Sequence, residues 1–252
     1  MLTADKTSGK DSFWLHGLLF ATILFACLLI LFFGYNNFIS HSEIWSIASA
    51  KLFGEFSHES NSLYYKSLFY ALLRGVYFLP LSNADHILAS RLLFAWVGVL
   101  SFLLGLMNFH ILFRSKGKTL AFSWLLLSCH IYMNNIYRVR ADLLSHLLFL
   151  VILLRINSLY QKKQWKKYDG VLSFLLFTSL LTTPKAIYGY LALFIYYLFL
   201  HRKKVLKNWF HFFQMFFTPL ALWFLAPWLL TKLGVFAENP LAYAFLYFVS
   251  AL

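Results

Sequence analysis

Long apolar runs separated by short polar segments dominate this chain. Most of the runs approach the ~20 residues that carry an α-helix across the hydrocarbon core of a bilayer. They are Phe13–Phe33, His86–Phe113, Thr119–Tyr137, Asp142–Tyr160, Gly170–Thr183, Ala186–Leu200 and Trp209–Leu230. The pattern therefore predicts an all-α, polytopic transmembrane protein with about seven spans.

The polar segments complete the predicted layout. Residues 1–12 form a cytoplasmic tail, 13–33 the first span, and 34–85 an outer loop with interfacial helices. Spans two to seven occupy residues 86–232. Residues 233–252 form a further outer loop and the start of an incomplete last span, which stops at Leu252 within an apolar run. We expect either a longer protein or a partner chain that supplies the missing carboxy-terminal part.

The composition agrees with a membrane protein, since 61% of the residues are hydrophobic and 12% are charged. The net charge of +13 does not indicate nucleic acid, because the basic residues gather in short segments between the apolar runs. These clusters are Arg114, Lys116 and Lys118; Arg155, Lys162, Lys163, Lys166 and Lys167; and Arg202, Lys203, Lys204 and Lys207. Such segments are typical of cytoplasmic loops.

Residues 61–80 are apolar but contain Lys66 and Arg74. A span here would place the three basic clusters on the outer side, against the positive-inside rule. We therefore predict a helix that lies in the outer interface or dips into it.

Glu43 follows the first span in the sequence Ser40-His-Ser-Glu43. This is a capping box, in which the serine accepts from the glutamate amide and the carboxylate reaches back to the serine amide. The alternative is a catalytic carboxylate at the rim of an outer cavity, and a rigid helix start is compatible with both roles.

Asp142 and Lys185 are the next candidates for chemistry. Asp142 ends the short outer segment Arg138-Val139-Arg140-Ala141, where either a helix N-terminus or an anion site is expected. Lys185 follows Pro184 between two short spans, and we expect an outward-facing cavity with this cation near its floor. The histidines show no metal-ligand spacing, and no glycine-rich phosphate loop is present.

The order of these features resembles the amino-terminal membrane module of the GT-C superfamily, integral-membrane glycosyltransferases that use polyprenyl-phosphate-linked sugars. The motifs are His41-Ser42-Glu43-Ile44-Trp45 after the first span, the helix Asn61–Pro80 with its start Leu63-Tyr64-Tyr65, Ser90–Gly98 in the second span, Arg138–Asp142 before the fourth, and Leu181–Lys185 before the sixth.

The resemblance implies sugar transfer, with inversion, from a polyprenyl-phosphate donor to a lipid or glycan acceptor on the outer face. Glu43 would be the base, and Asp142 would orient the substrates or hold a divalent cation, Mg²⁺ or Mn²⁺. The cations expected to hold the phosphate are Lys185, Arg138 and Arg140, followed by Arg74 and Arg91. The supporting residues are His41, Trp45 and Tyr64.

Two alternatives remain open. One is a non-catalytic or incomplete GT-C-like scaffold subunit, and the other is a polytopic lipid or solute transporter. For all three hypotheses we expect an integral multi-pass protein with a cytoplasmic amino terminus. The expected membrane is the bacterial inner membrane, or the endoplasmic reticulum in a eukaryote.

Overall fold

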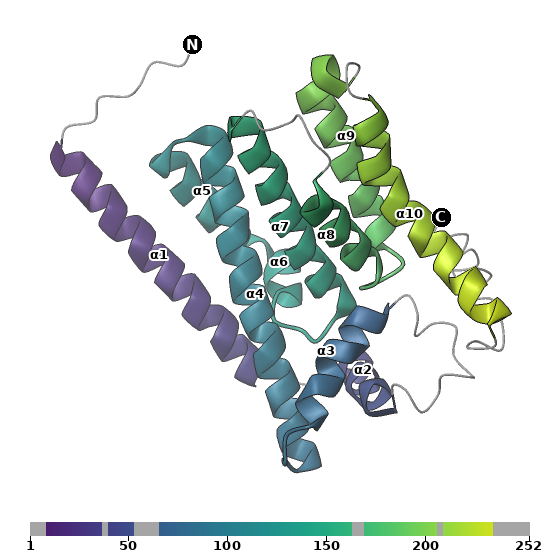
Figure 1. The fold of residues 1–252 in the computed structure, drawn as a ribbon. Helices are drawn as coiled ribbons and strands as arrows, with labels where there is room; N and C mark the ends of the chain where they lie inside the picture. The colour runs from purple at the N-terminus through teal and green to yellow at the C-terminus, as the bar shows by residue number, and fades with distance from the viewer. Residues whose placement is uncertain (1–8, 37–39, 53–65, 163–168, 206–208, 234–252) are drawn as a thin grey trace.

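Helices form all the regular secondary structure in the described part of the chain, a computed structural model of residues 9–36, 40–52, 66–162, 169–205 and 209–233. They are α1 (Gly9–Asn36), α2 (His41–Leu52), α3 (Ser67–Tyr77), α4 (Asn83–Phe113), α5 (Lys116–Ser128), α6 (His130–Asn135), α7 (Ala141–Lys162), α8 (Gly170–Leu180), α9 (Ala186–Val205) and α10 (Trp209–Lys232). The predicted all-α class is confirmed for these residues. Figure 1 shows α4 and α7 side by side near the centre of the bundle.

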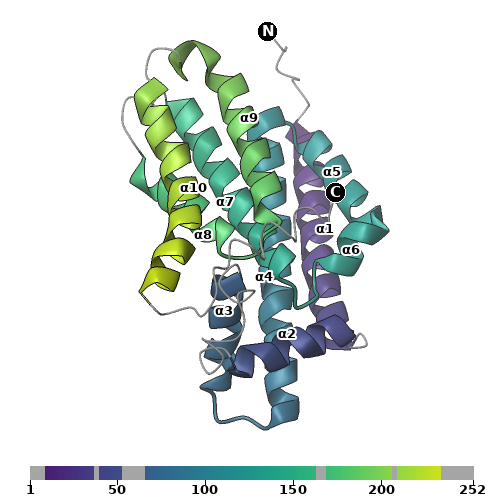
Figure 2. The same cartoon turned by 90° about the vertical axis from the view of Figure 1, so that its right-hand side faces the viewer.

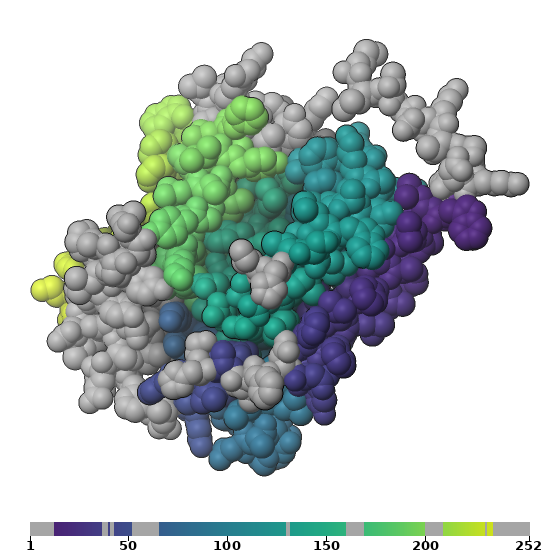
Figure 3. Space-filling model, turned by 180° about the vertical axis from the view of Figure 1, so that it is seen from behind, coloured from purple at the N-terminus to yellow at the C-terminus, as the bar shows by residue number. Residues whose placement is uncertain are grey.

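Four of the described helices are long and apolar enough to cross a membrane. The qualifying segments are Phe13–Asn36 in α1, Asn83–Phe113 in α4, Ala141–Leu159 in α7 and Trp209–Leu229 in α10. Their outward faces are also apolar, as the exposed Phe20, Phe25 and Trp228 show. Figure 3 shows α1 along one flank of the molecule. A helical protein that spans a membrane explains both the lengths and the exposed apolar surface.

The remaining predicted spans differ from this pattern. The apolar helices Gly170–Leu180 and Ala186–Phe199 are shorter. The predicted span Thr119–Tyr137 is divided, because α5 ends before Cys129 and α6 begins after it, with this residue in an extended conformation. Part of the predicted outer loop, 53–65, and the final apolar run, 234–252, lie outside the described residues.

The two ends of the bundle carry different kinds of segment. Figure 1 shows the start of α1, the turn between α4 and α5, and the ends of α7 and α9 at one end. The basic clusters predicted to share one side follow or end these same helices. Helices α2 and α3 lie at the opposite end, beside the start of α4, in Figures 1 and 2. We call this opposite end the Glu43 end.

Helix α8 meets α3 end to end. The backbone N–H of Leu68, in the first turn of α3, donates to the carbonyl of Leu181 at 3.1 Å. The neighbouring carbonyl of Leu180 accepts from Nε1 of the fully buried Trp223 at 3.0 Å. The last carbonyls of a helix have no partner within that helix. The end of α8 is therefore closed by two segments, α3 and α10, that are distant in the sequence.

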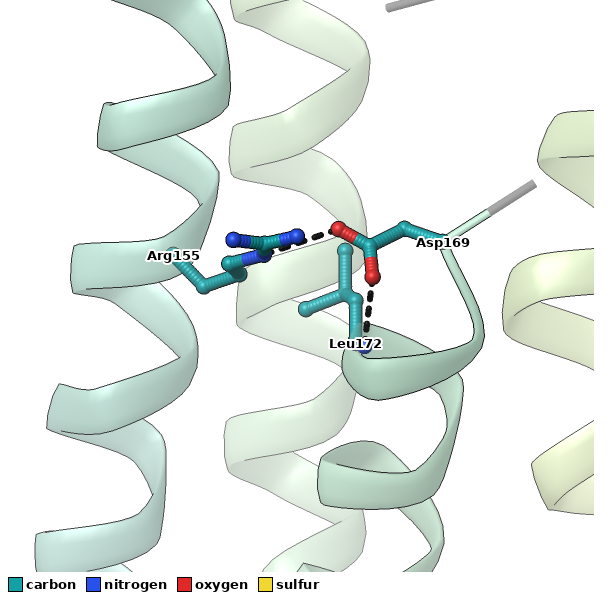
Figure 4. Close-up of polar contacts among 3 residues, drawn as sticks. All are labelled: Arg155, Asp169 and Leu172. Carbon is teal, nitrogen blue, oxygen red and sulfur yellow. Dashed lines mark hydrogen bonds and ion pairs between the residues drawn. The ribbon is translucent and has the colours of Figure 1, made fainter. Parts of the chain in front are cut away.

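Asp169 fixes the other end of α8 (Figure 4). Its Oδ1 accepts from the N–H of Leu172 at 3.1 Å, as expected of a helix cap, while Oδ2 accepts from Nε of Arg155 at 2.8 Å. The same carboxylate thus caps α8 and joins it to α7.

A polar chain connects α4, α7 and α9 within the bundle. Asn108 donates to the carbonyls of Leu104 and Leu150 at 2.9 and 3.0 Å. Its Oδ1 accepts from Asn157 at 3.2 Å, and the Oδ1 of Asn157 accepts from the Tyr196 hydroxyl at 2.8 Å. Interhelical hydrogen bonds of this kind stabilise membrane bundles.

The substitution Asn157→Leu is expected to destabilise the protein by about 2–3 kcal/mol, because it removes the donor to Asn108 and the acceptor of Tyr196 within a buried network. Thermal unfolding in detergent measures the effect. The control is Thr178→Val, since Thr178 bonds only to carbonyls of its own helix, α8. Equal losses in the two variants would contradict a role for the network between helices.

Candidate functional site

Among the predicted site residues whose side chains the structure describes, Glu43 is the most enclosed, with 1% of its surface exposed. The structure forms the predicted capping box at the start of α2: the Glu43 N–H donates to Ser40 Oγ at 3.4 Å. The N–H and the hydroxyl of Ser40 each donate to Glu43 Oε2 at 2.9 Å. The other oxygen, Oε1, accepts from the backbone N–H of Val139 at 3.1 Å.

This last bond gives Glu43 a function that the local pattern does not contain. It joins α2 to the segment Arg138–Arg140, which precedes α7 and lies 96 residues further along the chain. Both carboxylate oxygens are engaged by N–H or O–H donors, and almost none of the side chain reaches solvent. A general base needs hydrogen-bond access to its substrate. The geometry therefore favours Glu43 as a residue that positions the arginine segment.

Two asparagines hold the arginines on either side of Val139. Arg138 Nη2 donates to Asn134 Oδ1 at 2.7 Å, and Arg140 Nη1 donates to Asn135 Oδ1 at 3.0 Å. Both asparagines belong to α6. Each bond uses one guanidinium nitrogen, and both arginines remain partly exposed. Their direction is therefore set by α6 while donors remain for another partner.

A cavity of about 340 Å³ lies between α6 and the first turns of α7. It is lined by Tyr132, Asn135, Ile136, Arg140, Asp142, Leu143 and His146. Asp142 and His146 are both exposed, and their spacing of four residues places them on one face of α7. The cavity thus combines a carboxylate, an imidazole and a guanidinium.

Lys66 adds positive charge near Asp142 of this cavity, and Lys185 lies within electrostatic range of Lys66. Burial lowers the pKa of Lys66, which precedes α3; the nearby carboxylate of Asp142 acts in the opposite direction, and the charge of Lys185 adds to the lowering. Lys66 therefore lies within electrostatic range of both residues. Lys185 is exposed and is not one of the residues that line this cavity.

The other predicted residues lie outside this group. Arg74 is half-buried in the last turn of α3, and Trp45 on α2 is exposed. Arg91 is buried within α4. Tyr64 lies outside the described residues; His41 begins α2, but its side chain is likewise outside them.

Comparison with protein-family models, curated proteins and solved structures finds no match for this chain. Any function must therefore be argued from the residues themselves.

Within the described ranges, no group of three or more histidine, cysteine, aspartate and glutamate side chains could hold a metal ion. Asp142 and His146 offer two ligands on one helix face. A Mg²⁺ ion commonly takes one or two carboxylates and completes its shell with substrate phosphate and water. Asp142 could therefore bind the expected Mg²⁺ or Mn²⁺ only if a phosphate group of the substrate supplied further ligands to the ion.

Sequence reasoning missed Lys66, His146 and the two asparagines as members of the site. In the sequence, Lys66 indicates only that residues 61–80 do not form a span. The charged groups that act on it, Asp142 in α7 and Lys185 after α8, are distant in the sequence. His146 carried a usable signal, its spacing of four residues from Asp142 on a predicted helix. Asn134 and Asn135 precede their arginines by four and five residues, a local spacing that also could have indicated the pairing.

Proposed function

We propose that this chain is a membrane glycosyltransferase that uses a polyprenyl-phosphate-linked sugar at the Glu43 end, with Asp142 as the base. One observation carries the proposal: an exposed carboxylate lines a cavity together with Arg140 and His146, and lies within electrostatic range of Lys66. Fixed cations around one carboxylate suit a reaction that removes a proton and releases a phosphate.

In this mechanism Asp142 accepts the proton of the acceptor hydroxyl. The hydroxyl oxygen forms a bond to the anomeric carbon, and the bond from that carbon to the phosphate oxygen breaks. The electron pair leaves with the polyprenyl phosphate, so the configuration inverts. Arg140, Lys66 and Lys185 stabilise the charge that gathers on the phosphate. Glu43 acts indirectly, because its bond to Val139 fixes the backbone between Arg138 and Arg140.

Asp142→Asn is expected to lower sugar transfer by about 10²-fold or more, because the proton acceptor is lost while the exposed position should tolerate the change. The measurement is transfer from a panel of polyprenyl-phosphate sugars to lipid and glycan acceptors in proteoliposomes. Asp85→Asn is the matched control, since Asp85 is an exposed acid in the first turn of α4, bonded to the capping residue Ser82, and does not line the cavity.

Equal transfer by the two variants would exclude Asp142 as the base. Absence of transfer by a folded wild-type protein with every donor would contradict the glycosyltransferase proposal as a whole.

Transport of an anionic lipid or solute is a second candidate, and the interrupted helices favour it. Helix α5 breaks at Cys129 before α6, and α8 stops at Leu180 where α3 meets it. Discontinuous helices at membrane depth are common at the binding sites of transporters. Uptake of labelled phosphate or polyprenyl-phosphate sugar into the same proteoliposomes, without transfer, would favour this candidate.

A further inference from the structure

A second polar cluster lies in the first turns of α4, where no residue lines the cavity described above. His86, Ser90 and Arg91 are 7%, 0% and 4% exposed. In the described residues, five buried side-chain nitrogen and oxygen atoms have no hydrogen-bond partner. Four of the five belong to these residues: His86 Nδ1, Ser90 Oγ, and Arg91 Nε and Nη2. Unpartnered buried atoms that arose by chance would be distributed over the whole bundle. Their concentration in two turns of one helix therefore indicates a binding site.

The two arginine atoms form one edge of the guanidinium group. Nε–H and Nη2–H point in parallel, which is the arrangement that binds two oxygens of a carboxylate or phosphate. Arginine does not lose its proton in proteins, so Arg91 cannot escape the cost of burial by becoming neutral. A buried charge without a partner is strongly destabilising. This edge of the guanidinium group is therefore suited to bind an anion.

The residues beside Arg91 suit an anion that carries oxygens. The Ser90 hydroxyl, one residue before Arg91 on the helix, is an additional buried donor without a partner. His86 Nε2 lies 3.1 Å from the Leu79 carbonyl, which can only accept, so Nε2 carries a proton. In the neutral ring Nδ1 is then an acceptor and can take the hydrogen of a protonated phosphate oxygen.

Helical spacing shows which face of α4 carries Arg91. Ala95 and Gly98 follow at helical spacing on the same face of α4. A Cβ built on Gly34 of α1 would meet Ala95, and one built on Gly98 would meet the carbonyl of Ile136. The face that carries Arg91 is thus directed toward α1 and the segment after α6. None of this cluster lines the α6–α7 cavity.

We propose that Arg91 and Ser90, with His86 one turn before them on the helix, bind a phosphate group at the start of α4. The recognising chemistry is the same whether the phosphate belongs to a lipid headgroup or is a free ion. The site is separate from the proposed transfer reaction and does not depend on it.

The test uses the full chain in an uncharged detergent and follows thermal unfolding. One arm adds sodium phosphate, with sodium chloride at equal ionic strength as the reference; another adds phosphatidic acid, with diacylglycerol as the reference. At a ligand concentration about 100 times the dissociation constant, the unfolding temperature of the wild type should rise by about 5 °C or more. Response to phosphatidic acid alone assigns the site to a lipid, and response to free phosphate alone assigns it to the ion. Response to neither overturns the proposal.

Variants of α4 identify the residue responsible. Arg91→Met should abolish the rise and, without phosphate, unfold no earlier than the wild type, because an apolar side chain replaces an unpaired charge. Arg114→Met, at the exposed far end of the same helix, should respond as the wild type does. A rise that persists in Arg91→Met overturns the proposal.

Ser90→Ala keeps the test decisive if Arg91→Met does not fold. Loss of one hydroxyl donor should weaken the apparent phosphate affinity by about tenfold, with little change in stability without the ligand. An unchanged affinity in this variant would remove Ser90 from the site and overturn the proposal.

Discussion

Glu43→Ala is expected to lower the free energy of unfolding by about 3 kcal/mol or more, which corresponds to a fall of about 6–12 °C in the unfolding temperature. Two costs combine. The capping box at the start of α2 is lost, which typically costs about 1 kcal/mol. The buried N–H of Val139 also loses its carboxylate acceptor, and an unsatisfied buried donor costs about 1–3 kcal/mol. Thermal unfolding in detergent measures the change.

Glutamine is not a neutral replacement at this position. The two oxygens of Glu43 accept from two backbone amides, those of Ser40 and Val139. The side-chain amide of glutamine has one oxygen, so its NH₂ group must face an N–H on one side. We expect Glu43→Gln to destabilise the protein by about 1–3 kcal/mol. A loss of activity in this variant alone would therefore not establish Glu43 as a base.

The control for both substitutions is Asp85→Ala. Ser82 and Asp85 form the same local arrangement at the start of α4, with the Asp85 N–H donating to Ser82 Oγ at 3.3 Å and the Ser82 hydroxyl donating to Asp85 Oδ2 at 2.6 Å. Asp85 is exposed, so the expected cost is limited to the cap, about 1 kcal/mol. If Glu43→Ala and Asp85→Ala had equal effects, the bond to Val139 would contribute nothing to stability.

Gly98→Ala is expected to destabilise the protein by about 3 kcal/mol and to reduce the sugar transfer proposed above. A Cβ at this position would lie 1.9 Å from the carbonyl oxygen of Ile136 and 2.9 Å from its carbonyl carbon. Backbone atoms cannot rotate away as a side chain can, so α4 and the segment after α6 must separate. Ile136 lines the α6–α7 cavity, and the displacement therefore reaches Arg140 and Asp142.

Gly105→Ala on the same helix is the matched control. A Cβ there would meet no atom within 4 Å. Replacement of a helical glycine by alanine in open space should stabilise α4 by up to about 1 kcal/mol. The two glycine variants should thus change the unfolding temperature in opposite directions, and activity should fall only in Gly98→Ala. If both glycine variants changed the unfolding temperature in the same direction, helix propensity and not the contact with Ile136 would determine the effect.

Much of the fold was predictable because apolar runs of sufficient length can hardly form anything else in a membrane. The helices that contain Phe13–Phe33 and His86–Phe113 follow this rule, and the turn at Thr182–Pro184 was indicated by its residues. The break at Cys129 was not, since neither proline nor glycine marks it. Its position depends on how α6 packs against the rest of the bundle.

The candidate site was predictable only in its local part. The capping box of Glu43 spans four residues and could be recognised from the sequence. The bond to Val139 joins residues 96 positions apart, and no periodicity relates them. Lys66 shows the same limitation, because its charged neighbours belong to elements far along the chain. Interactions between residues so far apart depend on how the helices pack, and local sequence patterns do not determine that packing.

The contact between α8 and α3 has a consequence for the order in which the protein is assembled. Each helix has 11 residues, a rise of about 16 Å, so either alone covers about half of the ~30 Å thickness of a bilayer core. About 110 residues separate Leu68 from Leu181, which a ribosome takes roughly 5–20 s to synthesise. During that interval the first turn of α3 lacks its carbonyl partner. The hydrogen bond between α3 and α8 can therefore form only late in translation, after the chain as far as Leu181 has been synthesised.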